Sequence, residues 1–391
     1  MIKESIYIKN IGPLVEVNIT EIKPITVFIG PSASGKSTIM KVIALMRYIY
    51  KLVNIRSYLK SSGISKAPFN IHFRSLLHDG LDKMFSADSE IRYEVFIGGR
   101  AYTIEYRARK LRANILVSPE DLIFCKESYI SDTRGAIPTW TSKVASNKGA
   151  KLGFYFHETF SDFDEATDLI DEQGFDYFGL SMRVQRGSNQ RKRIVLSDAE
   201  GNLPAIDLHH ASSGIQTSVP LLVLLRYFAR GFSFKEAFRR SVLSYLYEGN
   251  RLSDFQPSIE PKDIPNYLHV HIEEPELSLD PEAQMWLLNS MLRLTLTEAE
   301  SDRKLGVMIA THSPYIVNML NVYLRAGYSQ DEEIRSLYPL LREGDLSVYR
   351  VDGGMVHSLM ATNNNNGQAV VNAIDLSEPM ARIHQYYIDI P

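Results

Sequence analysis

Apolar and polar positions fall into runs that predict early strands followed by a long helix. Residues 6–19 and 25–29 are apolar, β-rich runs, and Gly12-Pro13 and Pro24 mark turns. From residue 37 to about residue 58, apolar residues recur at helical spacing, which predicts an amphipathic helix. The basic residues of this helix are predicted to form its solvated face: Lys41, Arg47, Lys51 and Arg56.

Paired apolar runs around glycine turns predict two hairpins further along the chain. The first joins residues 91–97 to residues 101–107 at Gly98-Gly99, and the second joins residues 194–196 to residues 203–208 around Gly201-Asn202. An apolar-periodic stretch over residues 374–388 predicts a closing helix near the C-terminus.

One loop has the residues of a phosphate-binding loop in the required setting. Gly30-Pro31-Ser32-Ala33-Ser34-Gly35-Lys36-Ser37 lies between a predicted strand and the predicted long helix. This order directs backbone N–H groups and a helix N-terminus at the β- and γ-phosphates, while Lys36 adds a charge and Ser37 a Mg²⁺ ligand. The predicted nucleotide contacts are Gly30, Ser32, Ala33, Ser34, Gly35, Lys36, Ser37 and Thr38.

A pair of adjacent acids ends another predicted strand. Residues 267–272 are apolar at every second position, and Glu273 and Glu274 follow. Because strand side chains alternate, one carboxylate can hold Mg²⁺ and the next can orient the attacking water. The alternative interpretation is a polar strand end that leads into a turn at Pro275.

Two more segments add a serine-rich loop and a histidine. Ala211-Ser212-Ser213-Gly214 precedes an apolar helix predicted over residues 219–228, and a small-residue loop that opens a helix is an anion site. Residues 307–310 form a short apolar strand, and His312 follows at the edge where ligands gather in an open α/β sheet. Each segment alone is a weak signal, because Ser-Ser-Gly is a common turn and a histidine after a strand is more often structural.

Together these segments resemble the ATP-binding-cassette (ABC) ATPase superfamily, and within it the soluble SMC-like and OLD-like (overcoming-lysogenization-defect) branch. The resemblance runs from residue 6 to about residue 320. It implies an α/β fold: a P-loop NTPase with an ABC-ATPase-like head, an antiparallel β-layer beside the nucleotide and a short inserted helical lobe. The implied organisation assigns residues 1–134 and 194–391 to the two parts of the head and residues 135–193 to the insertion.

The resemblance also implies catalytic roles. Glu273 is expected on the Mg²⁺ side of the site, Glu274 as the general base, and His312 as the switch histidine that contacts the γ-phosphate and the attacking water. ATP and Mg²⁺ are the implied ligands. One departure is Glu273 itself, because aspartate is commoner at this position in the family.

A second set of residues is implied to act on a neighbouring subunit. Ser212, Ser213 and Gly214 match the signature motif, which caps the γ-phosphate bound to another subunit, and Asp280 matches the loop that crosses the dimer interface. The active unit is therefore expected to be at least a homodimer. Ser213 and Ile215 depart from the pattern, since transporters usually have Gly and Gln there.

Two contacts of the family have no obvious counterpart in this sequence. No glutamine occupies a glutamine-loop position, and the best substitute is residues 128–134, from which Ser131, Asp132 or Arg134 would reach the γ-phosphate or Mg²⁺. The adenine-stacking residue is left open between Tyr7 and Phe28, and either of them is also consistent with a core residue.

Composition fits a cytoplasmic enzyme of more than one typical domain. The chain has 391 residues, 45% of them apolar, and its single cysteine, Cys125, excludes internal disulfides. No signal-peptide pattern opens the sequence, and the longest apolar run, residues 219–225, is too short to cross a membrane. With a net charge of −3, any DNA contact requires a local patch. His269 and His271 are predicted to pack rather than to bind metal, since no third ligand has a suitable spacing.

The insertion carries an acidic run followed by a basic run. It is too short for the long coiled coil of SMC-like relatives and has no sustained heptad repeat. One interpretation is a lobe that docks a partner or touches DNA, and the other is a solvated excursion. The acidic run is Asp162, Asp164, Glu165, Asp168, Asp171 and Glu172, and the basic run is Arg183, Arg186, Arg191, Lys192 and Arg193.

The resemblance leaves more than one function open. Stand-alone members of the branch resemble the ATPase subunits of two-gene anti-phage systems such as PARIS or Septu, which act with a separate effector, typically a nuclease, after a DNA or phage-protein trigger. The residues after Ser313 are too few for a nuclease domain and a closing helix, which favours a separate effector. The alternatives are the nucleotide-binding subunit of a membrane transporter, an SMC-like DNA-repair ATPase, and a monomeric P-loop kinase or GTPase, which would leave the signature loop unexplained.

Overall fold

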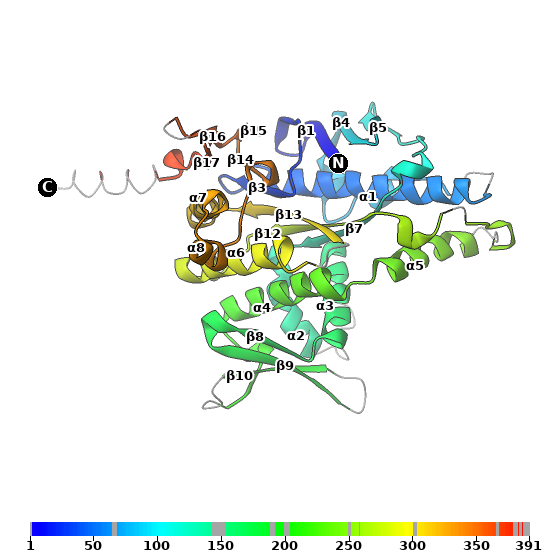
Figure 1. Cartoon of the computed structure of the whole chain (residues 1–391). Coiled ribbons are helices and arrows are strands. Elements are labelled where there is room, and N and C mark those ends of the chain that lie inside the picture. The colour runs from blue at the N-terminus through cyan, green and yellow to red at the C-terminus, as the bar shows by residue number, and fades with distance from the viewer. Residues whose placement is uncertain are drawn as a thin grey trace.

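A six-stranded sheet forms the centre of the computed structural model (Figure 1). Its order is β15-β14-β3-β13-β12-β7, and all neighbours are parallel except β14 and β15. The strands are β3 (Ile25–Ile29), β7 (Phe124–Ile130), β12 (Asn266–Glu273), β13 (Arg303–Thr311), β14 (Leu346–Asp352) and β15 (Met355–Ser358). The described residues are 2–64, 69–142, 153–187, 192–198, 204–248, 252–257, 259–299, 303–364, 367–377, Arg382 and Gln385.

The strands of the central sheet are apolar on both faces. All five residues of β3 are buried, as are the last six of β12, because helices and a second sheet cover this sheet from both sides. The sequence runs are correspondingly rich in Val and Ile rather than strictly alternating. This burial explains why five neighbouring strands can be parallel here.

A five-stranded antiparallel sheet forms a second layer. Its order is β2-β1-β4-β5-β6, and the predicted hairpin at Gly98-Gly99 is confirmed by the pairing of Ile97 with Arg100. Both glycines have positive φ, which this tight turn requires. The strands are β1 (Lys3–Ile11), β2 (Leu14–Ile19), β4 (Phe85–Ile97), β5 (Arg100–Arg107) and β6 (Lys110–Arg112).

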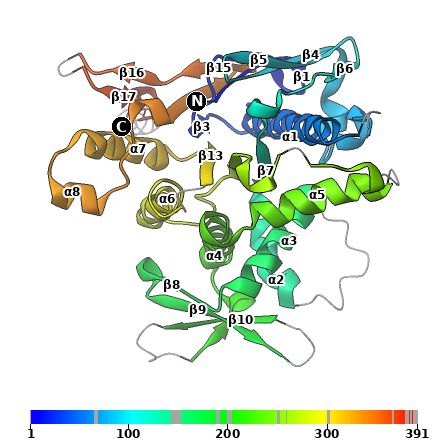
Figure 2. The ribbon, with the colours of Figure 1, turned by 45° about the vertical axis from the view of Figure 1, so that its right-hand side comes forward.

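Helix α1 (Lys36–Ser61) lies between the two sheets (Figures 1 and 2). The prediction that its basic residues form a solvated face is wrong for Arg47 and Arg56, which are buried. Arg47 donates to Glu4 of β1 over 2.8 Å, and Arg56 donates to the carbonyl of Ala113. A helix covered on both sides has no solvated face, so its arginines serve as buried donors.

A lobe of helices and strands lies on the other side of the central sheet, where α4 and the strands β8–β10 are seen in both views (Figures 1 and 2). Its four-stranded antiparallel sheet has the order β11-β10-β9-β8. The predicted pairing of residues 194–196 with residues 203–208 occurs between Leu196 and Ile206, while Gly201-Asn202 lie outside the described residues. The elements are α2 (Ile137–Ser142), α3 (Phe154–Leu169), β8 (Glu172–Phe175), β9 (Leu180–Arg186), β10 (Lys192–Asp198), β11 (Ile206–Asp207) and α4 (Ser213–Arg226). Helix α5 (Phe234–Glu248) instead packs against α1 and β7 through Phe238.

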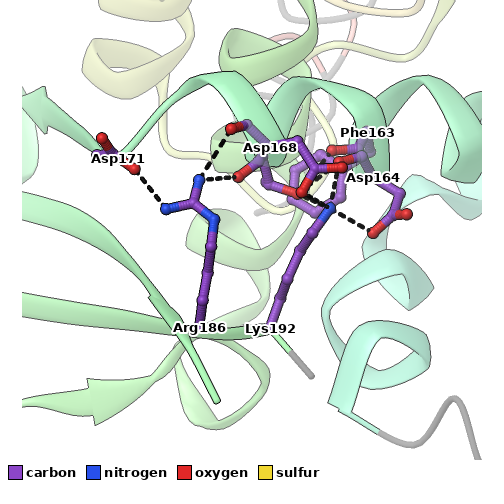
Figure 3. Close-up of polar contacts among 7 residues, drawn as sticks. Phe163, Asp164, Asp168, Asp171, Arg186 and Lys192 are labelled. Atoms are coloured by element: carbon purple, nitrogen blue, oxygen red, sulfur yellow. Dashed lines mark hydrogen bonds and ion pairs between the residues drawn. The ribbon is translucent and has the colours of Figure 1, made fainter. Parts of the chain in front are cut away.

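The acidic and basic runs of the insertion pair with each other (Figure 3). Lys192 of β10 lies 2.8 Å from Asp164 and 2.9 Å from Asp168, both on α3. Arg186 of β9 pairs with Asp171 and donates to the carbonyls of Thr167 and Asp168. These contacts attach the strands to α3. The predicted basic residue at position 191 lies outside the described residues.

The remaining elements complete the C-terminal part of the head. They are α6 (Pro281–Leu296), α7 (Pro314–Tyr328), α8 (Glu332–Leu337), β16 (Met360–Thr362) and β17 (Ala369–Val371). Of the closing helix predicted over residues 374–388, a short 3₁₀ turn over Ile374–Ser377 is seen, and most of the rest lies outside the described residues. Within the described ranges, every helix is too short or too polar to span a bilayer.

Candidate functional site

The predicted motifs that follow strands meet at one edge of the central sheet. β3, β7, β12 and β13 are parallel, so their C-terminal ends lie together. Ile29, Ile130, Glu273 and Thr311 are the last residues of these strands, and each motif begins at or just after one of them. This edge is where ligands bind in open parallel sheets.

The lysine side chain of the phosphate loop bonds back to the loop backbone. The Lys36 ammonium donates to the carbonyls of Gly30 and Pro31 over 3.0 and 2.9 Å. Ala33 and Gly35 have positive φ, and a Cβ at Gly35 would approach a methyl of Leu14 to 2.5 Å, so only glycine fits at this position. Burial lowers the pKa of Lys36, while the carboxylates of Glu274 and Glu276 act in the opposite direction.

Glu273 is buried and held by a tyrosine. The hydroxyl of Tyr129, on β7, donates to the Glu273 carboxylate over 2.6 Å and lies 3.4 Å from the carbonyl of Ser37. Burial and the Glu273 charge raise the pKa of Tyr129, which keeps it a donor. Tyr129 therefore bridges the carboxylate of Glu273 and the backbone of Ser37, the two residues predicted to bind Mg²⁺. Their hydroxyl and carboxylate oxygens fit a hard cation.

Glu274 and His312 lie side by side. Nε2 of His312 is 3.6 Å from the Glu274 carboxylate, and the two side chains are 34% and 39% exposed. Glu274 has a φ of 44°, a left-handed conformation unusual for a residue with a side chain. Its N–H donates to the Ala310 carbonyl over 2.8 Å, which holds this conformation at the strand end. The arrangement presents a base and an imidazole to the same space.

Glu276 is a site residue that the motif analysis did not assign. Its carboxylate accepts from the hydroxyl of Thr311 over 2.8 Å and from the N–H of His312 over 2.7 Å. The second oxygen, Oε2, is buried without a hydrogen-bond partner in the described part of the chain. The available signal was a third acid in Glu273-Glu274-Pro275-Glu276, but its direction toward His312 follows only from the tertiary structure.

Arg134 holds the acidic end of β12 in place through buried hydrogen bonds. Its side chain is 1% exposed, and its guanidinium donates to the carbonyls of Glu273, Glu274, Ser131 and Thr217. Burial lowers the pKa of Arg134 to about 10, although nearby carboxylates raise it. Four donors are thus committed to backbone, and the predicted phosphate contact of Arg134 is replaced by a positioning contact. Ser131 and Asp132 begin the same turn, and the Ser131 hydroxyl bonds to Thr133.

The signature loop opens α4 and packs against the segment that follows Glu276. Ser212 is the N-cap of α4, its side chain makes no capping hydrogen bond, and both Ser212 and Ser213 are exposed. A Cβ at Gly214 would lie 2.7 Å from the carbonyl of Ser278, so the loop packs tightly against the segment before α6. In both views α4 lies in the lobe, whereas α1 lies in the layer on the opposite side of the central sheet (Figures 1 and 2).

Asp280 caps α6 on the same surface. Its carboxylate accepts from the N–H groups of Glu282 and Ala283 over 3.0 Å each, and these bonds lower the pKa of Asp280. The hydroxyl of Tyr177, from the turn between β8 and β9, also donates to Asp280 over 3.3 Å. The Tyr177 ring stacks on Trp286 of α6, with centroids 5.7 Å apart. The inserted lobe therefore contacts the loop expected at a dimer interface.

Comparison with known families assigns this chain to a family. Residues 25–318 match the family described as "AAA domain, putative AbiEii toxin, Type IV TA system". The chain belongs to this family. Together with its sheet topology and phosphate loop, this makes it a P-loop ATPase with an ABC-type head, and the predicted fold class is confirmed. A search of curated proteins gives no match.

Solved structures provide distant fold similarities. The SMC head domain from Thermotoga maritima is 13% identical with a TM-score of 0.38, and the match covers 92% of this chain and 98% of that one. The recombination mediator RecF is 11% identical with a TM-score of 0.35 and the same coverages, 92% and 98%. A bacterial ABC transporter cassette is 11% identical with a TM-score of 0.30, covering 90% and 96%. These values carry no information on activity or partners.

Of the two residues suggested for adenine stacking, Phe28 belongs to the core and Tyr7 lies on β1 of the antiparallel sheet. Phe28 is 0% exposed and stacks on Tyr349 of β14 with a centroid separation of 5.8 Å, so it is a core residue. Tyr7 alternates with the buried Ile6 and Ile8 on β1, so its ring is on the opposite face of that strand. Its hydroxyl bonds to Glu16 of β2.

Proposed function

We propose that this chain hydrolyses ATP at sites shared between two copies of itself. Lys36 and the N–H groups of the phosphate loop bind the β- and γ-phosphates, and Ser37 and Glu273 hold Mg²⁺. When bound, Mg²⁺ neutralises charge on the phosphate oxygens during transfer. Glu274 accepts the proton of the attacking water, and His312, fixed by Glu276, orients that water and the γ-phosphate.

The position of the signature loop is the observation that supports a site shared between two chains. Ser212 and Ser213 are exposed at the open N-terminus of α4, a position suited to an anion. Helix α4 lies on the other side of the central sheet from α1, the helix that follows the phosphate loop (Figure 1). A second copy would supply the γ-phosphate that these groups lack in their own chain. The packing of Gly214 against Ser278 supports a single surface formed by the signature loop and the Asp280 loop.

The biological role proposed is nucleotide-dependent control of a separate effector, in antiviral defence. The family description names a toxin of a Type IV TA system, which supports a two-component arrangement. The contact of Tyr177 with Asp280 gives the lobe a direct connection to the interface loop. A change at the interface would therefore reach a surface where a partner protein can detect it.

The test is co-expression with the neighbouring gene and pull-down with and without ATP. We expect a soluble effector, for example a nuclease, to co-purify with the wild-type chain and with Glu274→Gln, and its association to differ for Lys36→Ala, which cannot bind nucleotide. Phage plaque counts measured with the same variants connect the complex to defence. If the partner that co-purifies is a membrane permease, or if association is identical for all three proteins, the proposal of effector control is wrong.

A further inference from the structure

A cluster of two histidines and an aspartate lies just before the signature loop. Asp207 ends β11, and His209 and His210 belong to the 3₁₀ turn Leu208–His210 that leads to Ser212. One donor atom from each of the three side chains lies within 4.8 Å of the others. The two imidazole rings have centroids 4.0 Å apart, inclined at 46°. The donor atoms of these three side chains are therefore close enough together to reach one ion.

The cluster is attached to structure at both ends. Asp207 pairs with Val195 in the sheet, and Arg193 donates to one carboxylate oxygen of Asp207, which orients the carboxylate and leaves its second oxygen available. The carbonyl of His209 accepts from the side chain of Gln216, in the first turn of α4, over 3.2 Å. Ligating carboxylates in metal sites are commonly oriented by an outer hydrogen bond of this kind.

The imidazoles themselves are available. Among the described residues, the ring nitrogens of His209 and His210 have no hydrogen-bond partner, although His209 is half-buried. Two unpaired imidazoles and a carboxylate form the donor set of zinc and related ions, whereas Mg²⁺ prefers oxygen ligands alone. The chemistry is therefore different from that of the ATP site.

We propose that Asp207, His209 and His210 bind a divalent transition-metal ion, with Zn²⁺ as the representative, independently of nucleotide. Three protein ligands leave at least one coordination position open to water or to a group from another molecule. Because the turn of His209 and His210 is two residues from Ser212, the bound ion fixes the backbone that enters the signature loop. Only this last consequence rests on the proposed function; the binding itself does not.

A second group of potential ligands, Cys125, Glu127 and His269, is less suited to a metal. Both carboxylate oxygens of Glu127 already bond to histidines, to Nδ1 of His269 over 2.7 Å and to Nε2 of His271 over 3.0 Å. This group is a hydrogen-bonded core network.

Calorimetric titration of Zn²⁺ into the full chain tests the proposal. The protein is freed of any histidine tag and of metal, and it is kept in excess Mg²⁺ without nucleotide. We expect one Zn²⁺ per chain. Asp207→Asn, which keeps an acceptor for Arg193, and His209→Ala should each weaken binding by at least about tenfold, because loss of even an outer contact commonly costs that much. His357→Ala, an exposed histidine on β15, should bind as wild type.

Cobalt spectroscopy and circular dichroism complete the test. Co²⁺ in the same site should give visible bands without the near-ultraviolet band of a thiolate ligand, and all variants should share the wild-type circular dichroism. The proposal is wrong if Zn²⁺ does not bind, if binding survives both Asp207→Asn and His209→Ala, or if it is lost in Cys125→Ser. ATP hydrolysis is measured separately, so an inactive enzyme that binds Zn²⁺ would count against the proposed function alone.

Discussion

Glu274 combines an unusual backbone with a position beside His312. Its φ of 44° carries a conformational cost, and the bond from its N–H to Ala310 maintains it. The consequence is that the carboxylate stands 3.6 Å from His312 rather than continuing the alternation of β12. A strained residue at the end of a buried strand is typical of a catalytic position.

Glu274→Gln should stop turnover while ATP still binds. The amide is nearly isosteric but cannot accept a proton from water, so kcat should fall by at least about 100-fold. Binding of a fluorescent ATP analogue should remain within a few-fold of wild type, whereas Lys36→Ala should abolish it. Near-wild-type hydrolysis by Glu274→Gln would show that another residue is the base.

Glu276 is expected to act through His312. Glu276→Ala removes the acceptor of the His312 N–H and the Thr311 hydroxyl, so kcat should fall about tenfold to hundredfold with little change in KM. Glu276→Gln keeps an acceptor oxygen and should retain most activity. If alanine and glutamine are equally impaired, or if KM changes instead of kcat, Glu276 does not position His312.

Single-residue predictions from sequence succeeded where the backbone itself carries the motif. Lys36 and His312 follow directly from a strand end and a loop, so their place at the sheet edge is predictable. Glu276 and Tyr129 act through contacts between strands that are neighbours in the sheet but far apart in sequence, and no local pattern encodes such contacts. Phe28 lies in a strand buried on both faces, and an aromatic residue there has the same sequence pattern whether it packs or stacks on a ligand.

At the scale of elements, Arg134 joins three segments that the sequence separates widely. It connects the turn after β7 to the end of β12 and to Thr217 in the second turn of α4. The acidic strand end and the signature helix are therefore held in a fixed relation by one buried side chain. The sequence predicted Arg134 as a phosphate ligand, because a motif does not show whether a side chain is buried.

Arg134→Met should destabilise the fold more than a surface arginine does. Four backbone carbonyls lose their donor, and a buried unsatisfied acceptor typically costs about 1–3 kcal/mol, so the free energy of unfolding should fall by at least about 2 kcal/mol. Arg92→Met, at an arginine that is 61% exposed and pairs with Glu94, should cost less than about 1 kcal/mol. Urea unfolding measures both, and equal losses would contradict the bracing role.

At the scale of the whole molecule, a buried charge network joins the two sheets through α1. Arg47 bonds to Glu4 of the antiparallel sheet, and Glu127 of the central sheet bonds to His269 and His271. Burial alone would raise the pKa of Glu127, but His269, His271 and Arg47 outweigh it and lower the pKa to about 2. Burial lowers the pKa of His271, so both groups favour the folded state near neutral pH.

Stability should therefore fall on acidification. The contribution of Glu127 is fully present above its unfolded pKa of 4.5 and decreases as the pH falls toward about 2; His271 loses its contribution below pH 6.5. By pH 3 the loss from Glu127 is on the order of 2 kcal/mol. Urea unfolding at pH 7 and pH 3 should show a smaller decrease for Glu127→Gln than for wild type. Glu105→Gln, a control at a half-buried glutamate outside the network, should follow wild type. Identical slopes for all three proteins would contradict the network.

The layered architecture was largely predictable, and the lobe was not. Buried Val and Ile runs and a glycine hairpin indicate the two sheets, because periodicity encodes local burial. The attachment of β9 and β10 to α3 depends on Lys192 and Arg186 finding Asp164, Asp168 and Asp171, a choice of partners that charge runs leave undetermined. The composite nucleotide site that we propose likewise depends on a second molecule.

The central claim is that each ATP site takes Lys36 and Glu274 from one chain and Ser212 from another. The direct measurement is ATP hydrolysis by a mixture of Lys36→Ala and Ser212→Arg proteins, each inactive alone. In each hybrid dimer one of the two sites then has an intact phosphate loop facing an intact signature loop. A hybrid dimer should therefore have about half the activity of a wild-type dimer, and an equimolar mixture with free subunit exchange about a quarter, because about half of its dimers are hybrid. No recovered activity, with subunit exchange demonstrated by a labelled partner, would contradict the shared-site account.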